Sequence, residues 1–336
     1  MEQPVVRFAI LGFGHFAGRR LAPAFAQSKH AALTGVWRRD ATAAAKNCAE
    51  FNIPHSFATR EELCSSPDVD VVFVTSPDSM HKEDVLLAIR HGKAVLCEKP
   101  LAMNATEAAE MAAAARGAGV VFGVGQNCRY SRSLEWLRKQ VQAGSIGEPQ
   151  LAMALYAHPA NLSPRRWITD ANLACGGPIG DVGVHCMDAL RFVLDREITS
   201  VQTFARRTAL SGGVEATASL HLEMTGGVYA NVSVSAWAPY RTAIEITGSN
   251  GTLIAENVFA VDGPVDLILR RAGAVVETVT VSNEDVYTQM LDGFAAAYRG
   301  HGEFAASGDD GVKNMRALDA AYKSWRSGVP EPVSAN

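Results

Sequence analysis

The chain has 336 residues, of which 48% are hydrophobic and 20% are charged. This length is typical of two domains that each bury a core of their own. Lys and Arg total 31 against 35 for Asp and Glu, so the formal net charge of -4 gives no electrostatic reason to expect nucleic acid as a partner. No apolar stretch approaches the ~18 to 20 residues of a membrane span. Residues 1–7 show no secretory leader pattern, so we expect a cytoplasmic protein without a membrane partner.

Six cysteines are scattered along the chain without a CxxC pair. This spacing favours reduced thiols over a disulfide framework, and it contains no metal-type cluster. We therefore expect most of these cysteines to be small buried hydrophobic side chains.

The first part of the chain alternates β-branched apolar runs with Ala-rich amphipathic stretches. Such alternation predicts a parallel sheet with helices on both faces. Strands are expected over 5–11, 32–37, 69–75, 94–97 and 120–125. Helices are expected over 15–28, 41–51, 81–91, 105–117 and 131–142. Pro23 predicts a kink or an early break in the first helix.

The pattern changes after residues 144–149, a turn-rich joint. A strand over 151–157 and a helix over 179–194 precede several strands with short turns, which predict an antiparallel sheet. Those strands are expected over 200–206, 216–223, 227–236, 242–248, 252–257, 265–270 and 275–281, with final helices over 286–299 and 311–327. We therefore expect an α/β Rossmann domain with a doubly wound parallel sheet over 1–126. An α+β domain with a large open, mainly antiparallel sheet, for substrate binding and oligomerisation, should follow over 127–336.

A glycine-rich turn lies between the first expected strand and the first expected helix. The turn consists of Gly12, Phe13, Gly14, His15, Phe16 and Ala17, which match the GxGxxG/A pattern in the context that the pattern requires. The first glycine allows a tight turn, and the second lets backbone amides approach a pyrophosphate. The small residue at the third position lets the helix pack on the strand. The sequence therefore predicts a dinucleotide site; the alternative is a tight strand-to-helix turn with no ligand.

The end of the second strand lacks the acidic residue that binds the ribose hydroxyls of NAD in this type of site. The chain has Trp37, Arg38 and Arg39 there, and Asp40 follows. A guanidinium group matches a 2'-phosphate, and the missing carboxylate removes a repulsion that would exclude one. We predict that these residues bind the adenosine end of NADP(H), with NAD(H) possible. In the alternative, the arginines are solvated and Asp40 turns back to the ribose.

Lys99 follows the strand expected over 94–97, at the edge of the parallel sheet where open α/β folds bind ligands. Pro100 fixes the chain just after this lysine and helps to aim its ammonium group. A reactive lysine fits this place. The alternative is a solvated lysine at the surface.

A second group of polar residues lies at the start of the helix expected over 179–194. Gly176 and Gly177 precede it, and Asp181 and His185 stand four residues apart, so both project from one helical face. A carboxylate and an imidazole on one face suit proton transfer to a hydroxyl or carbonyl group. The alternatives are a surface pair without catalytic meaning and a metal site. We expect no metal, because no third ligand stands at a characteristic spacing.

These motifs together resemble the Gfo/Idh/MocA family, which includes glucose-fructose oxidoreductase and inositol dehydrogenase. The resemblance rests on the glycine-rich turn, on Glu98-Lys99-Pro100, and on Gly176-Gly177 followed by Asp181 and His185. Some stretches, among them residues 96–103, are similar to the 1,5-anhydro-D-fructose reductase branch of the family, which uses NADPH. The resemblance covers nearly the whole chain and implies an oxidoreductase that acts on a sugar or polyol.

The resemblance also implies roles for single residues. Lys99 would be the catalytic lysine and would also touch the cofactor, Asp181 would orient the substrate, and His185 would give or take the proton. The further cofactor contacts implied are Thr75, Ser76, Pro77, His81, Glu98 and Asn127. Arg129 would lie near the substrate. Arg165 and Trp167 stand in a polar loop that could close over the substrate or could be an ordinary surface loop.

The mechanism expected is hydride transfer to or from a sugar or polyol in a cleft between the domains, with Lys99 polarising the oxygen and His185 relaying the proton. One rival is a non-catalytic regulator that binds the nicotinamide. The other is a lyase or glycosidase that oxidises its substrate transiently with bound NAD. The open second sheet needs cover on one face, so a homodimer or homotetramer is expected.

Overall fold

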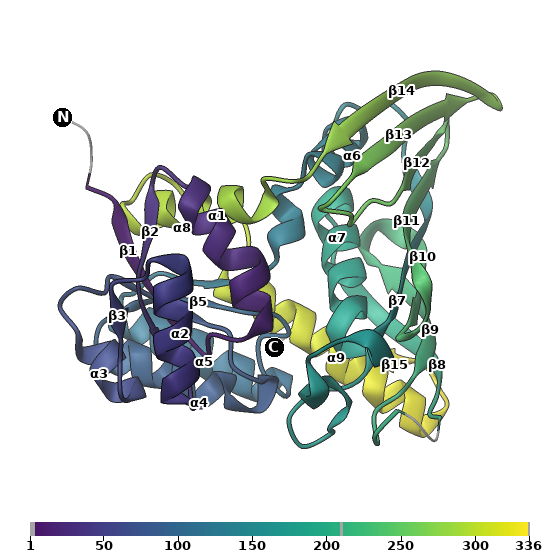
Figure 1. Cartoon of the computed structure of the whole chain (residues 1–336). Helices are drawn as coiled ribbons and strands as arrows, with labels where there is room; N and C mark the ends of the chain where they lie inside the picture. The colour runs from purple at the N-terminus through teal and green to yellow at the C-terminus, as the bar shows by residue number, and fades with distance from the viewer. Residues whose placement is uncertain (1–3, 209–210, 335–336) are drawn as a thin grey trace. The chain divides into compact units, whose positions relative to one another are not determined.

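The computed structural model describes residues 4–208 and 211–334. The chain forms two compact units (Figure 1). The first consists of Met1–Gln126 and Tyr287–Lys313, and the second of Asn127–Val286 and Asn314–Asn336. The division expected after residue 126 gives residues 287–313 to the second domain, whereas they pack in the first unit. Residues 1–3, 209–210 and 335–336 of the two expected domains lie outside the described residues.

The first unit is built on a six-stranded sheet with the order β3-β2-β1-β4-β5-β6. Its strands are β1 (Val6–Leu11), β2 (Ala31–Trp37), β3 (His55–Ser56), β4 (Val71–Val74), β5 (Ala94–Cys97) and β6 (Phe122–Val124). All neighbouring strands are parallel. The strand order reverses between β1 and β4, the switch point at which doubly wound sheets bind ligands. The expected Rossmann architecture is confirmed.

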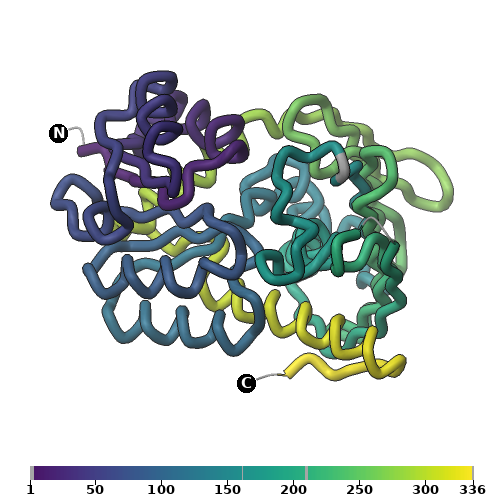
Figure 2. The backbone as a smooth tube through the Cα atoms, turned by 60° about the horizontal axis from the view of Figure 1, so that its bottom comes forward, coloured from purple at the N-terminus to yellow at the C-terminus, as the bar shows by residue number. Residues whose placement is uncertain are grey.

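Helices cover both faces of this sheet, so β4 and β5 are apolar and buried along their whole length. The helices are α1 (Ala22–Gln27), α2 (Ala41–Phe51), α3 (Arg60–Ser65), α4 (Asp78–Arg90), α5 (Ala105–Ala118) and α8 (Val286–Tyr298). The helices α4 and α5 lie side by side in both views (Figure 1, Figure 2), and an ion pair between Lys82 and Glu110 joins them.

The helix α8 returns to the first unit because its apolar face completes that core. Phe294 of α8 is fully buried, and its ring lies 6.0 Å from the ring of Phe8 in β1. Phe294 also packs against Phe304, and the centroids of these two rings are 5.1 Å apart. The amphipathic pattern identifies this helix but does not specify the core that it completes.

The early break expected at Pro23 does not occur, because Leu21 and Ala22 before it keep helical backbone angles. A π-helical turn, η1 (Ala17–Leu21), precedes α1, and Pro23 stands in the first turn of α1. Proline has no amide hydrogen and its ring crowds the preceding turn, so the first turn of an α-helix is where it is tolerated. The wider turn before α1 therefore lets the helical path continue without a sharp break.

The second unit is built on a nine-stranded sheet with the order β14-β13-β12-β11-β7-β10-β9-β8-β15. Its strands are β7 (Pro149–Pro159), β8 (Ile198–Arg206), β9 (Thr217–Met224), β10 (Val228–Ser235), β11 (Trp237–Gly248), β12 (Thr252–Glu256), β13 (Pro264–Arg271), β14 (Ala274–Ser282) and β15 (Glu331–Pro332). The pair β7 and β10 is parallel and the other pairs are antiparallel. The expected mainly antiparallel sheet is confirmed.

The helices of the second unit include α6 (Arg132–Gln142), α7 (Val184–Leu194) and most of α9 (Gly308–Ser327). Ten of the eleven residues of α7 are buried. The strand β10 alternates buried with exposed or half-buried residues, so one face of the sheet is packed and the other is open. Among residues 4–208 and 211–334, no helix has both the length and the apolar character that crossing a membrane requires.

Candidate functional site

The glycine-rich turn is fixed between the ends of three parallel strands. The amide of Gly12 donates to the carbonyl of Trp37 at the end of β2 (2.9 Å), and the Thr75 hydroxyl after β4 donates to the Gly12 carbonyl (3.0 Å). Gly12 has φ +99°, and a Cβ there would lie 2.6 Å from the backbone nitrogen of Ser76. A side chain at position 12 would therefore force these strand ends apart.

The other residues of the turn divide into a packed set and an open set. Phe13 and Ala17 are each 1% exposed, and the ring of Phe13 lies 5.8 Å from that of Phe51. Gly14 and His15 are exposed, and a Cβ at Gly14 would have no neighbour nearer than 3.8 Å. Phe16 is half-buried. The open backbone at the start of a helix, with no side chain at Gly14, fits the close approach of a pyrophosphate.

The residues after β2 are held in different ways. The indole nitrogen of Trp37 donates to the carbonyl of Ala58 (3.3 Å), and Arg38 is half-buried and donates from Nη1 to Oδ1 of Asn47 (2.8 Å). Arg39 is exposed. Asp40 is the N-cap of α2 and accepts from the amide of Ala43 (3.0 Å). Asp40 is therefore engaged by a backbone amide at the start of α2, which has no carbonyl partner within the helix.

Lys99 lies two residues beyond β5 and is half-buried. The loop around it is tied back to the loop after β4 through His81, which is 1% exposed. Nδ1 of His81 lies 3.0 Å from the Pro100 carbonyl and Nε2 lies 2.9 Å from the Ser76 carbonyl. Both contacts are hydrogen bonds only when both ring nitrogens carry protons, since carbonyl oxygens only accept. The expected contact of His81 with a cofactor stays a prediction.

A buried acid that was not predicted from the sequence supports the loop after β4. Asp84 in α4 is fully buried and accepts from the Ser76 hydroxyl (2.7 Å) and from Nη1 of Arg60 (2.7 Å). Burial raises the pKa of Asp84, while the hydrogen bonds from Ser76 and Arg60 oppose the rise. Its position in the sequence gives one signal: Asp84 stands three residues after His81 and four before Ala88, so it shares their buried helical face.

The remaining expected cofactor contacts are divided between the two units. Pro77 is the N-cap of α4 and is half-buried. Glu98 is half-buried, and its Oε2 accepts from the amide of Lys99 (3.2 Å). Asn127 belongs to the second unit and is 6% exposed. Their contacts with a cofactor stay predictions.

Asp181 and His185 lie in the second unit at the start of a continuous helical segment. Asp181 belongs to a π-helical turn, η5 (Ile179–Gly183), and His185 to α7. The Asp181 side chain is 15% exposed, and its Oδ2 lies 3.3 Å from Nε2 of His158 and 3.4 Å from Nη2 of Arg165. The imidazole of His158 and the guanidinium of Arg165 therefore both lie beside this carboxylate.

His185 is 9% exposed and lies among aromatic rings. Its ring stacks on that of Tyr156, with centroids 6.2 Å apart and planes at 24°, and Tyr156 stacks on Phe259 at 5.3 Å. Nδ1 of His185 lies 3.6 Å from Sγ of Cys128. The stack fixes the plane of the imidazole ring, and the thiol contacts one of its two nitrogens.

Arg129 forms a bidentate ion pair with Asp188, three residues after His185. Nε donates to Oδ2 at 2.9 Å and Nη2 to Oδ1 at 2.7 Å, and the side chains are 6% and 1% exposed. Asn314 also donates to Oδ1 of Asp188 (2.8 Å). The pair fixes the Arg129 turn to α7. The expected contact of Arg129 with substrate stays a prediction.

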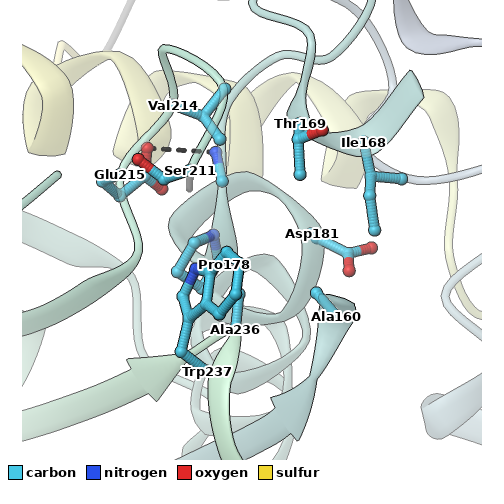
Figure 3. Close-up of a pocket in the computed structure, with 11 residues that line it drawn as sticks. Ala160, Ile168, Thr169, Pro178, Asp181, Ser211, Val214, Glu215, Ala236 and Trp237 are labelled. Atoms are coloured by element: carbon cyan, nitrogen blue, oxygen red, sulfur yellow. Dashed lines mark hydrogen bonds between the residues drawn. The ribbon is translucent and has the colours of Figure 1, made fainter. Parts of the chain in front are cut away.

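Asp181 lines a pocket of the second unit (Figure 3). The other lining residues are Ala160, Ile168, Thr169, Gly177, Pro178, Ser211, Val214, Glu215, Ala236 and Trp237. The volume enclosed by these residues, including the part that is open to solvent, is about 310 Å³. Trp167 packs beside the pocket with Trp237, against the buried residues Ala160, Ile168 and Ala236. Glu215 and Trp237 carry no motif that would reveal them in the sequence.

Within the part of the chain that the structure describes, no group of three or more His, Cys, Asp or Glu side chains is arranged to hold a metal ion. The polar groups around Asp181 and His185 are instead paired with one another, with Arg165 and with aromatic rings.

Comparison with known proteins gives the same assignment to both units. Residues 6–126 match the model of the Gfo/Idh/MocA oxidoreductase family with an NAD-binding Rossmann fold, and residues 134–254 match the model of its C-terminal domain. The chain is 34% identical over 281 residues to 1,5-anhydro-D-fructose reductase of Ensifer adhaerens, covering 83% of this chain and 84% of that one.

Two further relatives agree. Scyllo-inositol 2-dehydrogenase (NADP(+)) of Bacillus subtilis is 30% identical over 265 residues, covering 76% of this chain and 77% of that one. The crystal structure of aldose-aldose oxidoreductase from Caulobacter crescentus has a TM-score of 0.89 at 25% identity and covers 98% of this chain and 100% of its own. The chain therefore belongs to the Gfo/Idh/MocA family of oxidoreductases with an NAD-binding Rossmann fold.

Proposed function

We propose that the protein transfers hydride between NADP(H) and a secondary alcohol or carbonyl group of a sugar or polyol. The observation that carries the cofactor choice is the loop after β2. Arg38 and Arg39 stand where an NAD-selective site has an acid, and Asp40 is engaged as the N-cap of α2. Turning Asp40 to a ribose would remove this cap, at a cost of about 1 kcal/mol. NAD(H) remains the weaker cofactor in this proposal.

The substrate class is supported by the relatives. A 1,5-anhydro-D-fructose reductase and a scyllo-inositol 2-dehydrogenase are similar to this chain over three quarters or more of its length. Polyhydroxylated rings present many hydroxyl groups to be oriented. The polar groups around Asp181, namely the imidazole of His158 and the guanidinium of Arg165, offer donors and acceptors for them.

The proposed chemistry uses three side chains. The bound nicotinamide supplies or accepts the hydride. Lys99 stabilises negative charge on the substrate oxygen, His185 holds or moves the proton at that oxygen, and Asp181 orients a hydroxyl group. The aromatic stack on Tyr156 supports the role of His185, because a fixed ring plane lowers the cost of orienting the proton donor.

The test is turnover, followed by nicotinamide absorbance, of a panel of sugars, inositols and dicarbonyl sugars. Wild-type protein should turn over at least one of them with NADPH or NADP+, and Lys99→Ala should lose ~100-fold or more in kcat while it still binds NADPH. Wild-type turnover by Lys99→Ala would refute the role of the lysine.

The two rival functions give different outcomes in the same assay. A lyase or glycosidase that keeps NAD bound would consume substrate without a net change in nicotinamide absorbance. A non-catalytic regulator would bind the cofactor and consume nothing. Net NADPH oxidation or NADP+ reduction that depends on Lys99 is the outcome that supports the proposed function over both.

We also propose that the second sheet forms the interface of a homodimer or homotetramer. Large apolar side chains are exposed on several strands of this sheet, among them Leu151 (57%) in β7, Tyr229 (58%) in β10 and Phe204 (59%) in β8. Leu151 and Tyr229 are direct partners in the strand register. Light scattering of the wild type and of a Tyr229→Glu variant tests this: the variant should shift toward monomer, and a monomeric wild type would refute the interface.

A further inference from the structure

A buried carboxylate of the second unit binds the start of the helical segment that carries Asp181. Glu215 is 1% exposed and stands just before β9. Its Oε2 accepts from the amide of Gly177 (3.0 Å), and its Oε1 accepts from the amide of Ile179 (2.8 Å). These two donors flank Pro178, which has no amide hydrogen. One carboxylate therefore satisfies both amides on either side of the proline.

Three hydrogen-bond donors face the Glu215 carboxylate: two backbone amides and the Tyr322 hydroxyl. A negative charge at the first turn of a helix is stabilised by the helix dipole, and charge-assisted hydrogen bonds are about twice as strong as neutral ones. Tyr322 of α9 donates its hydroxyl to Oε1 of Glu215 (3.1 Å). Burial raises the pKa of Tyr322 well above its usual range, and the Glu215 charge raises it further, so the phenol stays a donor.

The two glycines before the helix leave room for this arrangement. A Cβ at Gly177 would lie 2.0 Å from the backbone oxygen of Glu215, and a Cβ at Gly176 would lie 1.7 Å from the hydroxyl oxygen of Tyr322. Neither distance is sterically possible, so any side chain at these positions would push the Glu215 backbone or the Tyr322 phenol away. The Gly-Gly pair in the sequence is explained by this packing.

We infer that Glu215 is a positioning residue for the proposed reaction: its carboxylate, supported by Tyr322, sets the direction in which the helix start presents Asp181 to the substrate. Asp181 is two residues beyond Ile179, and its own amide donates to the Gly177 carbonyl (2.9 Å). In the pocket, Glu215 and Asp181 lie on either side of Pro178 (Figure 3). A shift of the two amides that Glu215 holds therefore moves Asp181.

The effect of Glu215 on catalysis rests on the proposed function, whereas its effect on the start of the helix can be tested without a substrate. Three variants are compared with the wild type: Glu215→Gln, Tyr322→Phe, and Glu284→Gln as the control. Glu284 lies in the second unit between β14 and α8 and is exposed, so the same chemical change there touches neither glycine. In Glu215→Gln, the amide nitrogen of the new side chain faces a backbone donor, so at most one of the two bonds survives.

The first readout is amide hydrogen exchange of residues 177–183, which needs no substrate. Glu215→Gln should speed exchange there by roughly tenfold or more, while peptides of β9 and β10 exchange as in the wild type. Tyr322→Phe should give a smaller change in the same segment, which keeps the test open if Glu215→Gln does not fold. Glu284→Gln should leave the exchange of this segment as it is in the wild type. Exchange that rises throughout the second unit, or not at all, would overturn the inference.

The second readout is turnover on the substrate that the panel identifies. Glu215→Gln should lower kcat/KM by roughly tenfold or more, with the Kd for NADPH within about twofold of the wild type, because the cofactor turn lies in the other unit. An unchanged kcat/KM alongside faster exchange would overturn the catalytic part. If the wild type turns over nothing, the proposed function fails, and the exchange measurement still decides whether Glu215 holds the helix start.

Discussion

The buried pair of Arg129 and Asp188 gives a prediction whose size follows from the structure. Asp188→Asn removes the charge that faces the guanidinium and leaves Arg129 6% exposed beside a neutral amide. One amide oxygen can accept, but the amide nitrogen is a second donor that faces a donor. Removing one partner of a buried ion pair lowers the free energy of unfolding by about 3 to 5 kcal/mol, because the remaining charge stays buried without compensation.

The matched control is Asp285→Asn in the same unit. Asp285 pairs with Arg132 at 2.7 Å, the same distance as the buried pair, but these side chains are 30% and 55% exposed. Exposed pairs of this kind contribute about 0 to 1 kcal/mol, so the control should lose little stability. The comparison keeps the residue types and the contact distance and varies burial, together with the further partners of Asp188, which also lies 3.6 Å from Arg191 and accepts from Asn314.

The assay is thermal and urea unfolding followed by tryptophan fluorescence. A unit of this size loses about 2 to 4 °C in Tm per kcal/mol, so Asp188→Asn should lower the Tm by about 6 to 20 °C, and Asp285→Asn by a few degrees at most. The urea midpoint should move in the same order. Equal losses in the two variants would refute the assignment of the stabilisation to burial of the pair.

Two further predictions concern the first unit. Gly12→Ala should lower both the Tm and the affinity for NADPH, because its Cβ would meet Ser76 at 2.6 Å, whereas Gly14→Ala should keep the Tm and lower only the affinity. Thermal melts and fluorescence titration check this, and equal melting of both variants with no loss of NADPH binding contradicts it. Burial raises the pKa of Cys64 to about 12, so at pH 8 only about one thiol in 10⁴ is ionised. Iodoacetamide followed by mass spectrometry should leave native Cys64 unlabelled while half-buried Cys175 reacts, and rapid labelling of Cys64 contradicts the burial.

The regular elements of both sheets are largely predictable from the sequence. The strand β5 and the helix α2 begin and end where the sequence predicts, because apolar runs bounded by Asp, Asn and Gly carry the signal. The strand β3 was not predicted, since its two residues, His55 and Ser56, are both exposed and too few to show a period. The return of α8 to the first unit was also not predicted, because periodicity shows which face is apolar and not the core that it meets.

The candidate site shows the same limit. The glycine turn, Lys99, Asp181 and His185 are recognisable because their motifs depend on local spacing. The residues that hold them are distant in sequence: Asp84 supports the loop of Ser76, and Glu215 reaches back 36 and 38 residues to the start of the Asp181 helix. Such contacts depend on tertiary packing, which no short pattern records.

Discrimination between NADPH and NADH decides whether the loop after β2 binds a 2'-phosphate. The measurement is kcat/KM for NADPH and for NADH at a fixed concentration of the same sugar or polyol substrate, in the wild type and in Arg38→Ala. The wild type should prefer NADPH by at least about tenfold, equivalent to about 1.4 kcal/mol, and Arg38→Ala should lose most of this preference. A wild-type preference for NADH, or a preference for NADPH that survives unchanged in Arg38→Ala, would contradict the assignment of the 2'-phosphate site to this loop.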